Sequence, residues 1–394
     1  MKPSVAILRK TWVAGGAERY LTDLGRALGE DADVHFVGLE TAPSESTLSL
    51  LGAGDLVSRF DTWPANAGLI EQRAADFRLF VNAASSLWVR GRARHNWLVA
   101  FSPGPPQTGP WPVVRRIASR LLLHGIGSRV GSRVVPPRVR LRFALHPKAA
   151  QREILGSYDR VVAISRFVSE AVRRRWAVGS DVLYPGVDTT APQSRLPRMC
   201  SIVSVGRFAP YGNHKEHGVL IEAFRVFWQE HPDWTLHLAG SLEATPLCQS
   251  YLESLQNQAG KMAIEFHPNI SSADLQRLYA TSSLYWHGAG FGANPIRQPD
   301  QVEQFGMVLV ESMASGAVPM AYAAGGVTEI IEDQQSGFLW RTIPDLVRAT
   351  SRLISTPYLL SDVSRAAYLR SRVFDRQHFT NRVRRWYAYD ILEG

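Results

Sequence analysis

Short apolar runs alternate along the chain with longer stretches that have helical periodicity. In the first half, "SVAILRK", "DVHFVGLE", "NWLVAFS" and "RVVAIS" have the length and β-branched content of strands. Between the first two runs, "GGAERYLTDLGRALGE" has the spacing of a turn followed by an amphipathic helix. Alternation of this kind favours βαβ units with parallel strands.

The pattern pauses once and then begins again. "DVLYPGVD" is interpreted as a strand ending in a turn, and "TTAPQSRLPRM" after it has the Pro, Thr and Ser content of a linker. Strand and helix patterns then resume with "CSIVSVGRF", "KEHGVLIEAFRVFWQEH", "WTLHLAGS", "SADLQRLYATSS" and "LYWHG". They continue with a strand at "AVPMAY", a turn at "AAGG" and a helix at "VTEIIEDQQSG".

These patterns predict an α/β protein with two doubly wound, Rossmann-like domains. We place the first at residues 1–190 and the second at 191–372. Residues 373–394 read as an amphipathic helix whose aromatic side chains need a surface, and we expect it to pack on the first domain. Ligands of such sheets bind at the carboxyl ends of the strands, so we expect the two domains to face a central cleft.

Composition agrees with two globular domains. The chain has 394 residues, 45% of them hydrophobic, and no apolar run of about 18 residues that would span a membrane. The first apolar run is too short for the core of a signal peptide. Two cysteines suggest neither a disulfide framework nor a metal site, so we expect a soluble, cytoplasmic protein.

The formal net charge of +9 is concentrated in one segment. Residues 111–150 contain nine Arg and Lys residues and no Asp or Glu, so the rest of the chain is close to neutral. One interpretation is a solvated face. The other is an anionic membrane surface, or an acceptor on it, contacted by Arg115, Arg116 and Arg120 among interleaved apolar residues. Nucleic acid is the weaker option, since no reader motif occurs.

The stretch "EQFGMVLVESMASG" places two acids around the start of an apolar helix. Gly306 permits close approach of a ligand, and the amides of Met307 and Val308 are then the unpaired donors of a first turn, which attract phosphate. Glu311 follows on the same helix face, and Glu303 reaches the same pocket from its rim. A sugar-phosphate ligand would suit this arrangement.

The alternative is that Glu303 is a solvated loop residue and Glu311 an exposed helix position. The surrounding "GMVLVESMASGAVPMAY" is apolar on nearly all sides, which leaves Glu311 little solvent-exposed surface. Because a buried charge is costly unless it is paired or bound to a ligand, this context favours a ligand site.

Two further stretches have the chemistry of phosphate recognition. In "VGRFAPYGNHKEHGVLIEAF", Arg207 follows a strand and Lys215 opens a helix, as a diphosphate site requires, although surface cations are common. In "RKTWVAGGAERY", Gly15 and Gly16 lie between a strand and a helix, where they serve either a ligand or a simple tight turn.

Two other motif matches are rejected. Asp31-Ala32-Asp33 has the D-x-D form of a metal motif but lies between a helix and a strand, where acids are ordinary turn residues. "GAGFGA" fits a dinucleotide fingerprint, but "NPIRQPD" follows it and opens no helix, so we expect a mobile loop. No metal is expected, and no cofactor beyond a co-substrate.

The order of these motifs resembles that of GT-B glycosyltransferases of family GT4. The resemblance covers most of the chain, from "GGAER" through "YPGVD", "VGRF" with Lys215, "YWHGAGFG" and "EQFGMVLVESMASGAVP" to "GGVTEII". Glu303 and Glu311 have the E-x7-E spacing of that family. The resemblance implies the GT-B architecture and a retaining, metal-independent transfer of a sugar from a nucleotide diphosphate sugar to a lipid-linked or growing saccharide.

The resemblance also implies roles for individual residues. Arg207 and Lys215 would neutralise the diphosphate leaving group. The catalytic residues would be these two cations and Glu303. Glu311 would bind the ribose. The remaining donor-binding residues would be Gly15, Gly16, Asn269, Ile270, Phe305, Gly306, Met307 and Val308.

One stretch departs from the family pattern. Many relatives carry a first-domain histidine in an "H-x-P"-like context, where this chain has "WLVAFSPGPPQTGP" with Ser102-Pro103. His95 or His124 could substitute. The departure favours one alternative to an enzyme, a catalytically silent nucleotide-sugar binder or scaffold. The basic segment leaves another alternative open, a basic adaptor for membrane or nucleic acid. The enzyme would be cytoplasmic, with a peripheral position on the inner face of the plasma membrane as an option.

Overall fold

The structure is a computed structural model of the chain. It describes residues 2–13, 15–39, 41–84, 87–102, 147–189, 198–211 and 215–392. The chain divides into two compact units, one of residues 1–183 and 380–394 and the other of residues 184–379. Each is an α/β unit built on a parallel sheet.

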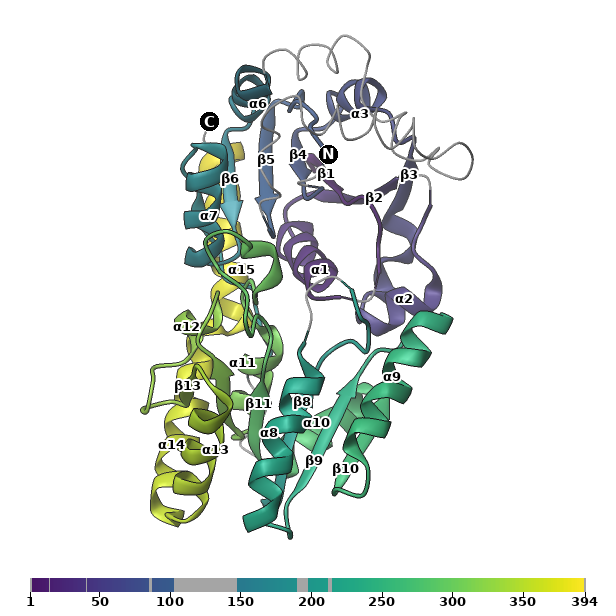
Figure 1. Cartoon of the computed structure of the whole chain (residues 1–394). Helices are drawn as coiled ribbons and strands as arrows, with labels where there is room; N and C mark the ends of the chain where they lie inside the picture. The colour runs from purple at the N-terminus through teal and green to yellow at the C-terminus, as the bar shows by residue number, and fades with distance from the viewer. Residues whose placement is uncertain are drawn as a thin grey trace. The chain divides into compact units, whose positions relative to one another are not determined.

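The first unit contains a seven-stranded sheet with the order β3-β2-β1-β4-β5-β6-β7, in which every pairing is parallel (Figure 1). Its strands are β1 (Ser4–Leu8), β2 (Asp33–Leu39), β3 (Phe60–Trp63), β4 (Leu79–Asn82), β5 (His95–Ala100), β6 (Arg160–Ala163) and β7 (Asp181–Val182). Its described helices are α1 (Gly16–Gly29), α2 (Glu45–Leu50), η1 (Gly54–Arg59), α3 (Ala67–Ala74), α6 (Pro147–Leu155) and α7 (Arg166–Trp176).

Helix α1 shows how the sequence pattern produces this packing. Its buried face includes Leu21, Leu24 and Leu28, which recur at helical spacing. A Cβ atom at Gly25 would lie 2.2 Å from the ring of Phe36 on β2. The missing side chain therefore lets the helix lie close against the sheet.

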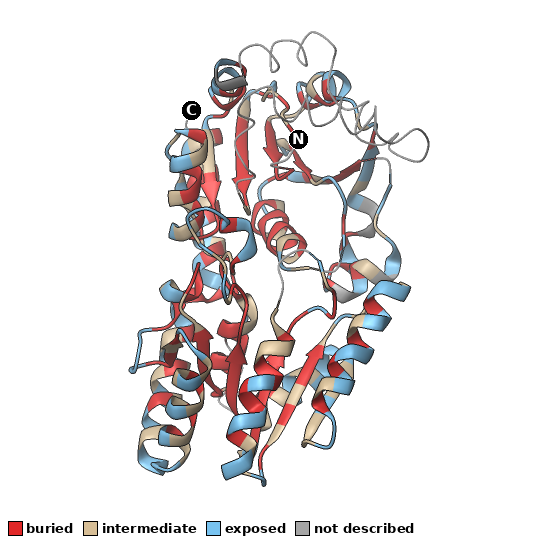
Figure 2. Ribbon diagram, in the orientation of Figure 1, coloured by how far each residue is buried: buried red, intermediate tan, exposed pale blue. Residues whose placement is uncertain are grey.

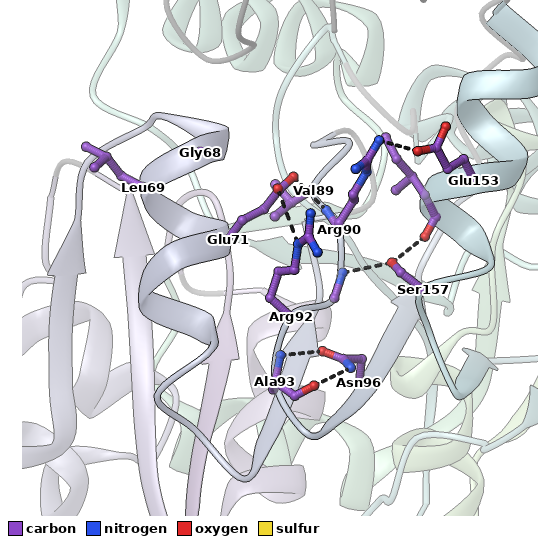
Figure 3. A network of polar contacts seen from close by, with 12 residues as sticks. Gly68, Leu69, Glu71, Val89, Arg90, Arg92, Ala93, Asn96, Glu153 and Ser157 are labelled. Carbon is purple, nitrogen blue, oxygen red and sulfur yellow. Dashed lines mark hydrogen bonds and ion pairs between the residues drawn. The ribbon is translucent and has the colours of Figure 1, made fainter.

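A polar network fixes the connection between β4 and β5 (Figure 3). The amide of Arg90 donates to Glu71 on α3, and the Arg90 guanidinium pairs with Glu153 on α6. The amide of Gly91 donates to the Ser157 hydroxyl at 2.8 Å. These contacts hold the loop at the amino end of β5 to the helices on either side.

The chain returns to the first unit at its end. Helix α15 (Arg376–Tyr387) continues into a π-helical turn, η4 (Ala388–Leu392). There the carboxylate of Asp390 pairs with Arg160 at 2.7 Å and accepts from the Trp97 indole at 3.0 Å. Trp386 packs edge-on against Trp97. The closing helix thus supplies aromatic and ionic partners to β5 and β6.

The second unit contains a six-stranded parallel sheet with the order β10-β9-β8-β11-β12-β13. Its strands are β8 (Met199–Val205), β9 (Thr235–Gly240), β10 (Ile264–Pro268), β11 (Ser282–His287), β12 (Val318–Tyr322) and β13 (Phe338–Trp340). Its helices are α8 (His217–Glu230), α9 (Pro246–Ala259), α10 (Ser272–Thr281), η2 (Pro299–Gln301), α11 (Met307–Ala314), α12 (Val327–Ile330), α13 (Ile343–Ile354), α14 (Pro357–Ser371) and η3 (Arg372–Phe374).

One face of this sheet forms the main core of the unit. Figure 2 shows the central strand β11 buried, the edge strand β10 partly exposed, and helices such as α8 buried on one side only. Leu236 and Leu238 of β9 and Trp286 of β11 pack with Phe224 and Phe227 of α8. Strand residues alternate between faces, so the residues between these apolar ones point to the other face.

Three details differ from the sequence-based expectations. The unit boundary lies between Leu183 and Tyr184 instead of after residue 190, and the return to the first unit begins at Thr380 instead of residue 373. "DVLYPGVD" contributes only Asp181–Val182 as a strand, with an isolated bridge at Val187.

The third difference concerns "VTEIIEDQQSG", which is not one helix. Helix α12 ends at Ile330 after one turn, and the chain then forms a turn. Gln334 has a φ of 62°, and the Glu332 amide donates to the Ser336 hydroxyl at 3.0 Å. Polar side chains here compete with helical hydrogen bonding, which ends the helix.

No helix within the described parts of the chain is both long and apolar enough to cross a membrane.

Candidate functional site

A partly buried ionic cluster lies at the carboxyl-end edge of the second sheet, with Lys215 21% and Glu303 12% exposed. His287 is the last residue of β11, Lys215 precedes α8, and Glu303 precedes α11. The Lys215 Nζ lies 2.5 Å from Glu303 Oε2, and His287 Nε2 lies 3.1 Å from the same oxygen. Three separate chain segments therefore converge on one carboxylate.

The partners of Glu303 keep it ionised. Burial alone would raise the pKa of this carboxyl, but the Lys215 ammonium and the His287 hydrogen bond outweigh burial and hold the pKa well below 4.5. The His287 ring is 2% exposed, and burial lowers its pKa against the opposing effect of Glu303. Because an ionised carboxylate can only accept, His287 donates to it from Nε2.

The second ring nitrogen of His287 has a different environment. His287 Nδ1 is buried and has no hydrogen-bond partner in the described structure. In the tautomer with the proton on Nε2, Nδ1 is an acceptor. An unpaired buried acceptor is costly and is usually satisfied by a water or a ligand.

Close backbone packing holds Glu303 and Lys215 in place. The amide of Gly326 donates to the Glu303 carbonyl at 2.8 Å. A Cβ atom at Gly325 would lie 2.2 Å from the same carbonyl oxygen, and one at Gly206 would lie 2.3 Å from Lys215 Cγ. Side chains at either glycine would displace a residue of the cluster.

Helix α11 begins directly after the cluster. Gly306 is its N-cap and has a φ of 109°, a conformation that favours glycine. Met307 and Val308 form the first turn and are half-buried. The first-turn amides have no intrahelical acceptor, so they remain donors for an anion.

Glu311 is buried inside this unit, which excludes the exposed helix position considered from the sequence. It is 8% exposed and accepts from the Tyr279 hydroxyl at 3.4 Å. Burial raises the pKa of Tyr285, with smaller contributions from the charges of both Glu303 and Glu311. The two acids of the E-x7-E stretch therefore both act on one buried tyrosine of β11.

Arg207 makes its contacts elsewhere in the same unit. Its guanidinium lies 5.7 Å from the centroid of the Tyr211 ring and 4.0 Å from the Glu243 carboxylate. The side chain is 42% exposed. The structure thus joins Lys215 to Glu303 directly and leaves Arg207 available to solvent and ligand.

Asn269 and Ile270 follow β10. Asn269 has a φ of 54°, and its side chain closes a loop by accepting from the Leu242 amide at 2.8 Å and donating to the Leu242 carbonyl at 3.2 Å. Ile270 is half-buried. The Asn269 side chain is therefore committed to holding the loop after β9.

Phe305 points into apolar packing. It is buried and packs against Tyr184 in a tilted and Phe374 in an edge-on arrangement, with centroid distances of 5.6 Å and 5.4 Å. Its side chain supports the turn that presents Glu303.

In the first unit, Gly15 is the N-cap of α1 and Gly16 its first residue. A Cβ atom at Gly15 would lie 2.8 Å from Glu18 Oε2. The Glu18 carboxylate pairs with Arg9, which follows β1, at 2.8 Å. The ion pair of Arg9 and Glu18 thus lies beside Gly15 at the start of α1. From the sequence, only the two glycines had been considered there.

The structure also addresses the first-domain histidine. His95 is the first residue of β5, at the opposite end of the sheet from the carboxyl ends where ligands bind. It therefore cannot substitute for the histidine, and Ser102 follows the carboxyl end of β5 in its place. His124, Arg115, Arg116 and Arg120 lie outside the described residues.

Sequence reasoning did not assign roles to His287, Glu18 or Arg9. His287 lies in "LYWHG", just before the final glycine. The available signal was a polar residue at the carboxyl end of a buried strand. Arg9 has the same position after β1. The partnership of Glu18 with Arg9 has no sequence signal, because it depends on how α1 packs.

Comparison with known proteins gives a consistent result. Residues 199–370 match the family model "Glycosyl transferases group 1". An uncharacterized glycosyltransferase of Haemophilus influenzae is 26% identical over 52% of this chain and 56% of its own length. The D-inositol 3-phosphate glycosyltransferase of Streptomyces griseus is 24% identical over 92% of this chain and 81% of its own. The chain thus spans little more than half of the first relative and most of the second.

Solved structures share the fold of the whole chain. HepE of Anabaena, in complex with UDP and glucose, has a TM-score of 0.69 at 18% identity and covers 98% of this chain and 100% of its own. Sucrose-phosphate synthase of Thermosynechococcus elongatus has a TM-score of 0.69 at 17% identity, with both chains fully covered. The expected α/β class and GT-B architecture are confirmed, and the matches support a glycosyltransferase.

Proposed function

We propose that this protein is a retaining glycosyltransferase of family GT4. It moves a sugar from a UDP- or GDP-linked donor to a lipid-linked or growing saccharide acceptor, as in the synthesis of cell-envelope polysaccharides or glycolipids. The observation that supports this best is the Lys215–Glu303–His287 cluster beside the start of α11, inside the segment that matches the family model.

Glu303 binds the donor sugar as a permanent hydrogen-bond acceptor. Its pKa is held well below the ordinary value by Lys215 and His287 against burial, so it has no proton to donate at neutral pH. An ionised carboxylate accepts hydrogen bonds from sugar hydroxyls, and these bonds strengthen as positive charge develops on the sugar. His287 orients this carboxylate and offers Nδ1 as a second acceptor.

Lys215 and Arg207 stabilise the departing nucleoside diphosphate. The Lys215 ammonium has three N–H donors, of which Glu303 engages one. The Arg207 guanidinium is partly exposed and can turn from Glu243 toward a diphosphate. The first-turn amides at Met307 and Val308, with Gly306 before them, add donors at the positive end of α11.

The other donor contacts are assigned in the same way. Glu311 binds the ribose, the segment at Asn269 and Ile270 lines the base pocket, and the backbone at Gly15 and Gly16 contacts the diphosphate from the first unit. Phe305 positions the turn before α11 through its packing. Since Glu18 is already paired with Arg9, its charge does not oppose this diphosphate contact.

We further propose front-face transfer without a protein nucleophile. The only carboxylate of the Lys215–His287 cluster is tied to both partners, which leaves it poorly suited to attack the anomeric carbon. A donor phosphate oxygen takes the proton of the acceptor hydroxyl. Two cationic side chains supply the charge that a metal would otherwise contribute, so the proposed reaction requires no metal ion.

The names of similar proteins support a sugar donor of this kind. One relative is a D-inositol 3-phosphate glycosyltransferase, and another, from Dictyostelium discoideum, is a GDP-Man:Man(3)GlcNAc(2)-PP-Dol α-1,2-mannosyltransferase. HepE structures contain UDP with glucose, or UDP-glucose. The mannosyltransferase name contains both a nucleotide sugar and a lipid-linked saccharide, which is the pairing proposed for this chain.

A screen of nucleotide sugars tests the proposal. The purified protein is heated with UDP- and GDP-linked sugars, and binding of a cognate donor raises Tm by mass action. Slow hydrolysis of that donor to nucleoside diphosphate then indicates catalysis. The absence of any Tm shift with every nucleotide sugar would refute the proposal.

The same screen separates the enzyme from a silent nucleotide-sugar binder. The departure at Ser102-Pro103 in the first unit favours the silent protein, whereas the intact Lys215–Glu303 pair favours the enzyme. A Tm shift with no sugar transfer to any saccharide or lipid acceptor, and no donor hydrolysis, would support the silent binder.

We also propose a peripheral position at the inner face of the plasma membrane, through the basic segment that contains Arg115, Arg116 and Arg120. Vesicles with about 30% anionic lipid should carry the protein in flotation at low salt and release it as salt rises. Equal flotation with neutral vesicles would contradict an electrostatic contact.

A further inference from the structure

Three metal-ligating side chains meet on the sheet face opposite the main core of the second unit. His237 lies on β9, and Glu265 and His267 lie on β10. Glu265 is directly across from His237 in the parallel register, and His267 lies two residues further on the same face. Between them, Leu236, Leu238 and Phe266 point to the apolar core.

The ligand atoms form a nearly regular triangle. His237 Nδ1 lies 3.1 Å from His267 Nε2 and 3.3 Å from Glu265 Oε2, and His267 Nε2 lies 3.6 Å from that same oxygen. Bonds of about 2.0–2.1 Å to a tetrahedral Zn²⁺ place neighbouring ligand atoms about 3.3 Å apart. The triangle therefore has the dimensions of one face of a zinc tetrahedron.

We propose that His237, Glu265 and His267 bind one Zn²⁺ ion, with water as the fourth ligand. Two imidazoles and one carboxylate suit zinc and disfavour Mg²⁺, which prefers oxygen ligands alone. Among the described residues, these three form the group of His, Cys, Asp and Glu side chains close enough to share an ion.

The two imidazoles are largely shielded from solvent and the carboxylate is not. The side chains of His237 and His267 are 12% and 26% exposed. Glu265 is 60% exposed, so an ion can enter from solvent beside it.

The position gives the ion a structural role. Strand β10 is at the edge of the six-stranded sheet and carries Asn269 just beyond its end. An ion bridging β9 and β10 would fix this edge and the loop after it. The site shares no residue with the Lys215–Glu303–His287 cluster, so removal of the ion leaves that cluster intact.

Zinc binding by the full chain tests this proposal. The protein is stripped with chelator, titrated with Zn²⁺ against a competing indicator, and examined with Co²⁺ for the visible absorption of tetrahedral coordination. We expect one Zn²⁺ per chain. His267→Gln and Glu265→Gln should each weaken binding by roughly 100-fold or more, since loss of even an outer partner costs about 10–100-fold.

Two controls keep the result interpretable. His378→Gln removes an exposed histidine outside the triangle and should bind Zn²⁺ as the wild type does. Glu265 is mostly exposed, so Glu265→Gln should fold normally, and circular dichroism checks this. Unchanged affinity in Glu265→Gln and His267→Gln, or no Zn²⁺ retained by the wild type, would reduce the triangle to a hydrogen-bonded cluster and overturn the proposal.

Discussion

Glu303 owes its chemistry to two neighbours that are distant in the sequence. Lys215 and His287 both contact Oε2, and together they overcome the effect of burial on the Glu303 pKa. The sequence identified Glu303 and Lys215 from the motifs around them. It did not reveal that they pair, or that His287 completes the contact, because pairing depends on which strand ends are neighbours.

Replacing Glu303 by Gln tests the charge at constant size. Gln cannot accept from Lys215 and from a sugar hydroxyl with the same strength, so we expect turnover to fall roughly 10²–10³-fold. Affinity for the free nucleoside diphosphate should change little, because that ligand lacks the sugar. Initial rates measure turnover, and calorimetry with UDP and GDP measures the affinity for the nucleoside diphosphate. Tyr389→Phe, a change at an exposed tyrosine, is the control and should leave turnover and affinity unchanged. Unaltered turnover would refute the assignment.

The same residue predicts a pH dependence of stability. The folded pKa of Glu303 is depressed below 4.5, so its contribution is fully present above about pH 4.5 and is lost as pH falls toward the folded value. The advantage of the wild type over Glu303→Gln in urea unfolding should therefore shrink below about pH 4.5. An advantage that stays constant from pH 5 to pH 3 would mean that the ion pair does not stabilise the fold.

Among the elements, the turn before α12 holds the Glu303 segment through its glycines. Gly325 and Gly292 both have a φ of 77°, but only Gly325 is crowded: its Cβ would lie 2.2 Å from the Glu303 carbonyl, whereas Gly292 has open space. The sequence predicted "AAGG" as a turn, and the structure adds that this turn packs on the segment that carries Glu303.

Alanine at these two positions separates backbone strain from the contact. Gly292→Ala should cost about 1 kcal/mol, from the positive φ alone. Gly325→Ala carries the same strain and must also displace Glu303, so it should cost at least about 2 kcal/mol more and reduce turnover. Urea unfolding and initial rates measure both. Equal losses in the two variants would show that the turn does not position Glu303.

The short helix α12 and strand β7 show where element prediction failed. Both segments have suitable apolar residues, but after α12 the Ser336 hydroxyl accepts from the Glu332 amide and the Asp333 carboxylate accepts from the Leu339 amide, which stabilises a turn in place of further helix. The long elements, such as α8 and β8, were predicted well because their periodicity extends over several turns or residues. Short elements are decided by local polar competition, which hydrophobic patterns do not encode.

For the whole molecule, the closing helix supports the first unit. Asp390 is 11% exposed and links Arg160 with the Trp97 indole. Asp390→Ala would leave the Arg160 charge without this partner, so we expect a loss of about 2–4 kcal/mol. Asp362→Ala, on an exposed position of α14, is the matched control. Equal unfolding midpoints for the two variants would contradict this role for the closing helix.

Chelation separates the proposed reaction from the proposed zinc site. With Lys215 and Arg207 as the cations at the diphosphate, we expect the initial rate at 25 °C in EDTA to stay within about twofold of the rate without it. The same treatment should lower Tm by roughly 5–10 °C relative to protein saturated with Zn²⁺. Loss of transfer in EDTA that only Mg²⁺ or Mn²⁺ restores would contradict the metal-independent reaction.

The sequence by itself determined the α/β class, the two sheets and the segments that carry Lys215, Glu303 and Glu311. Those features follow from hydrophobic period and from glycines and charges at strand ends, which are local properties. Only the tertiary structure decided that His287 joins Lys215 on Glu303, that His95 lies at the wrong end of its strand, and that His237, Glu265 and His267 form a triangle. Each of these depends on strand order and register. Neighbouring strands of a parallel sheet are separated by long connections in the chain, so local sequence patterns do not reveal which residues meet.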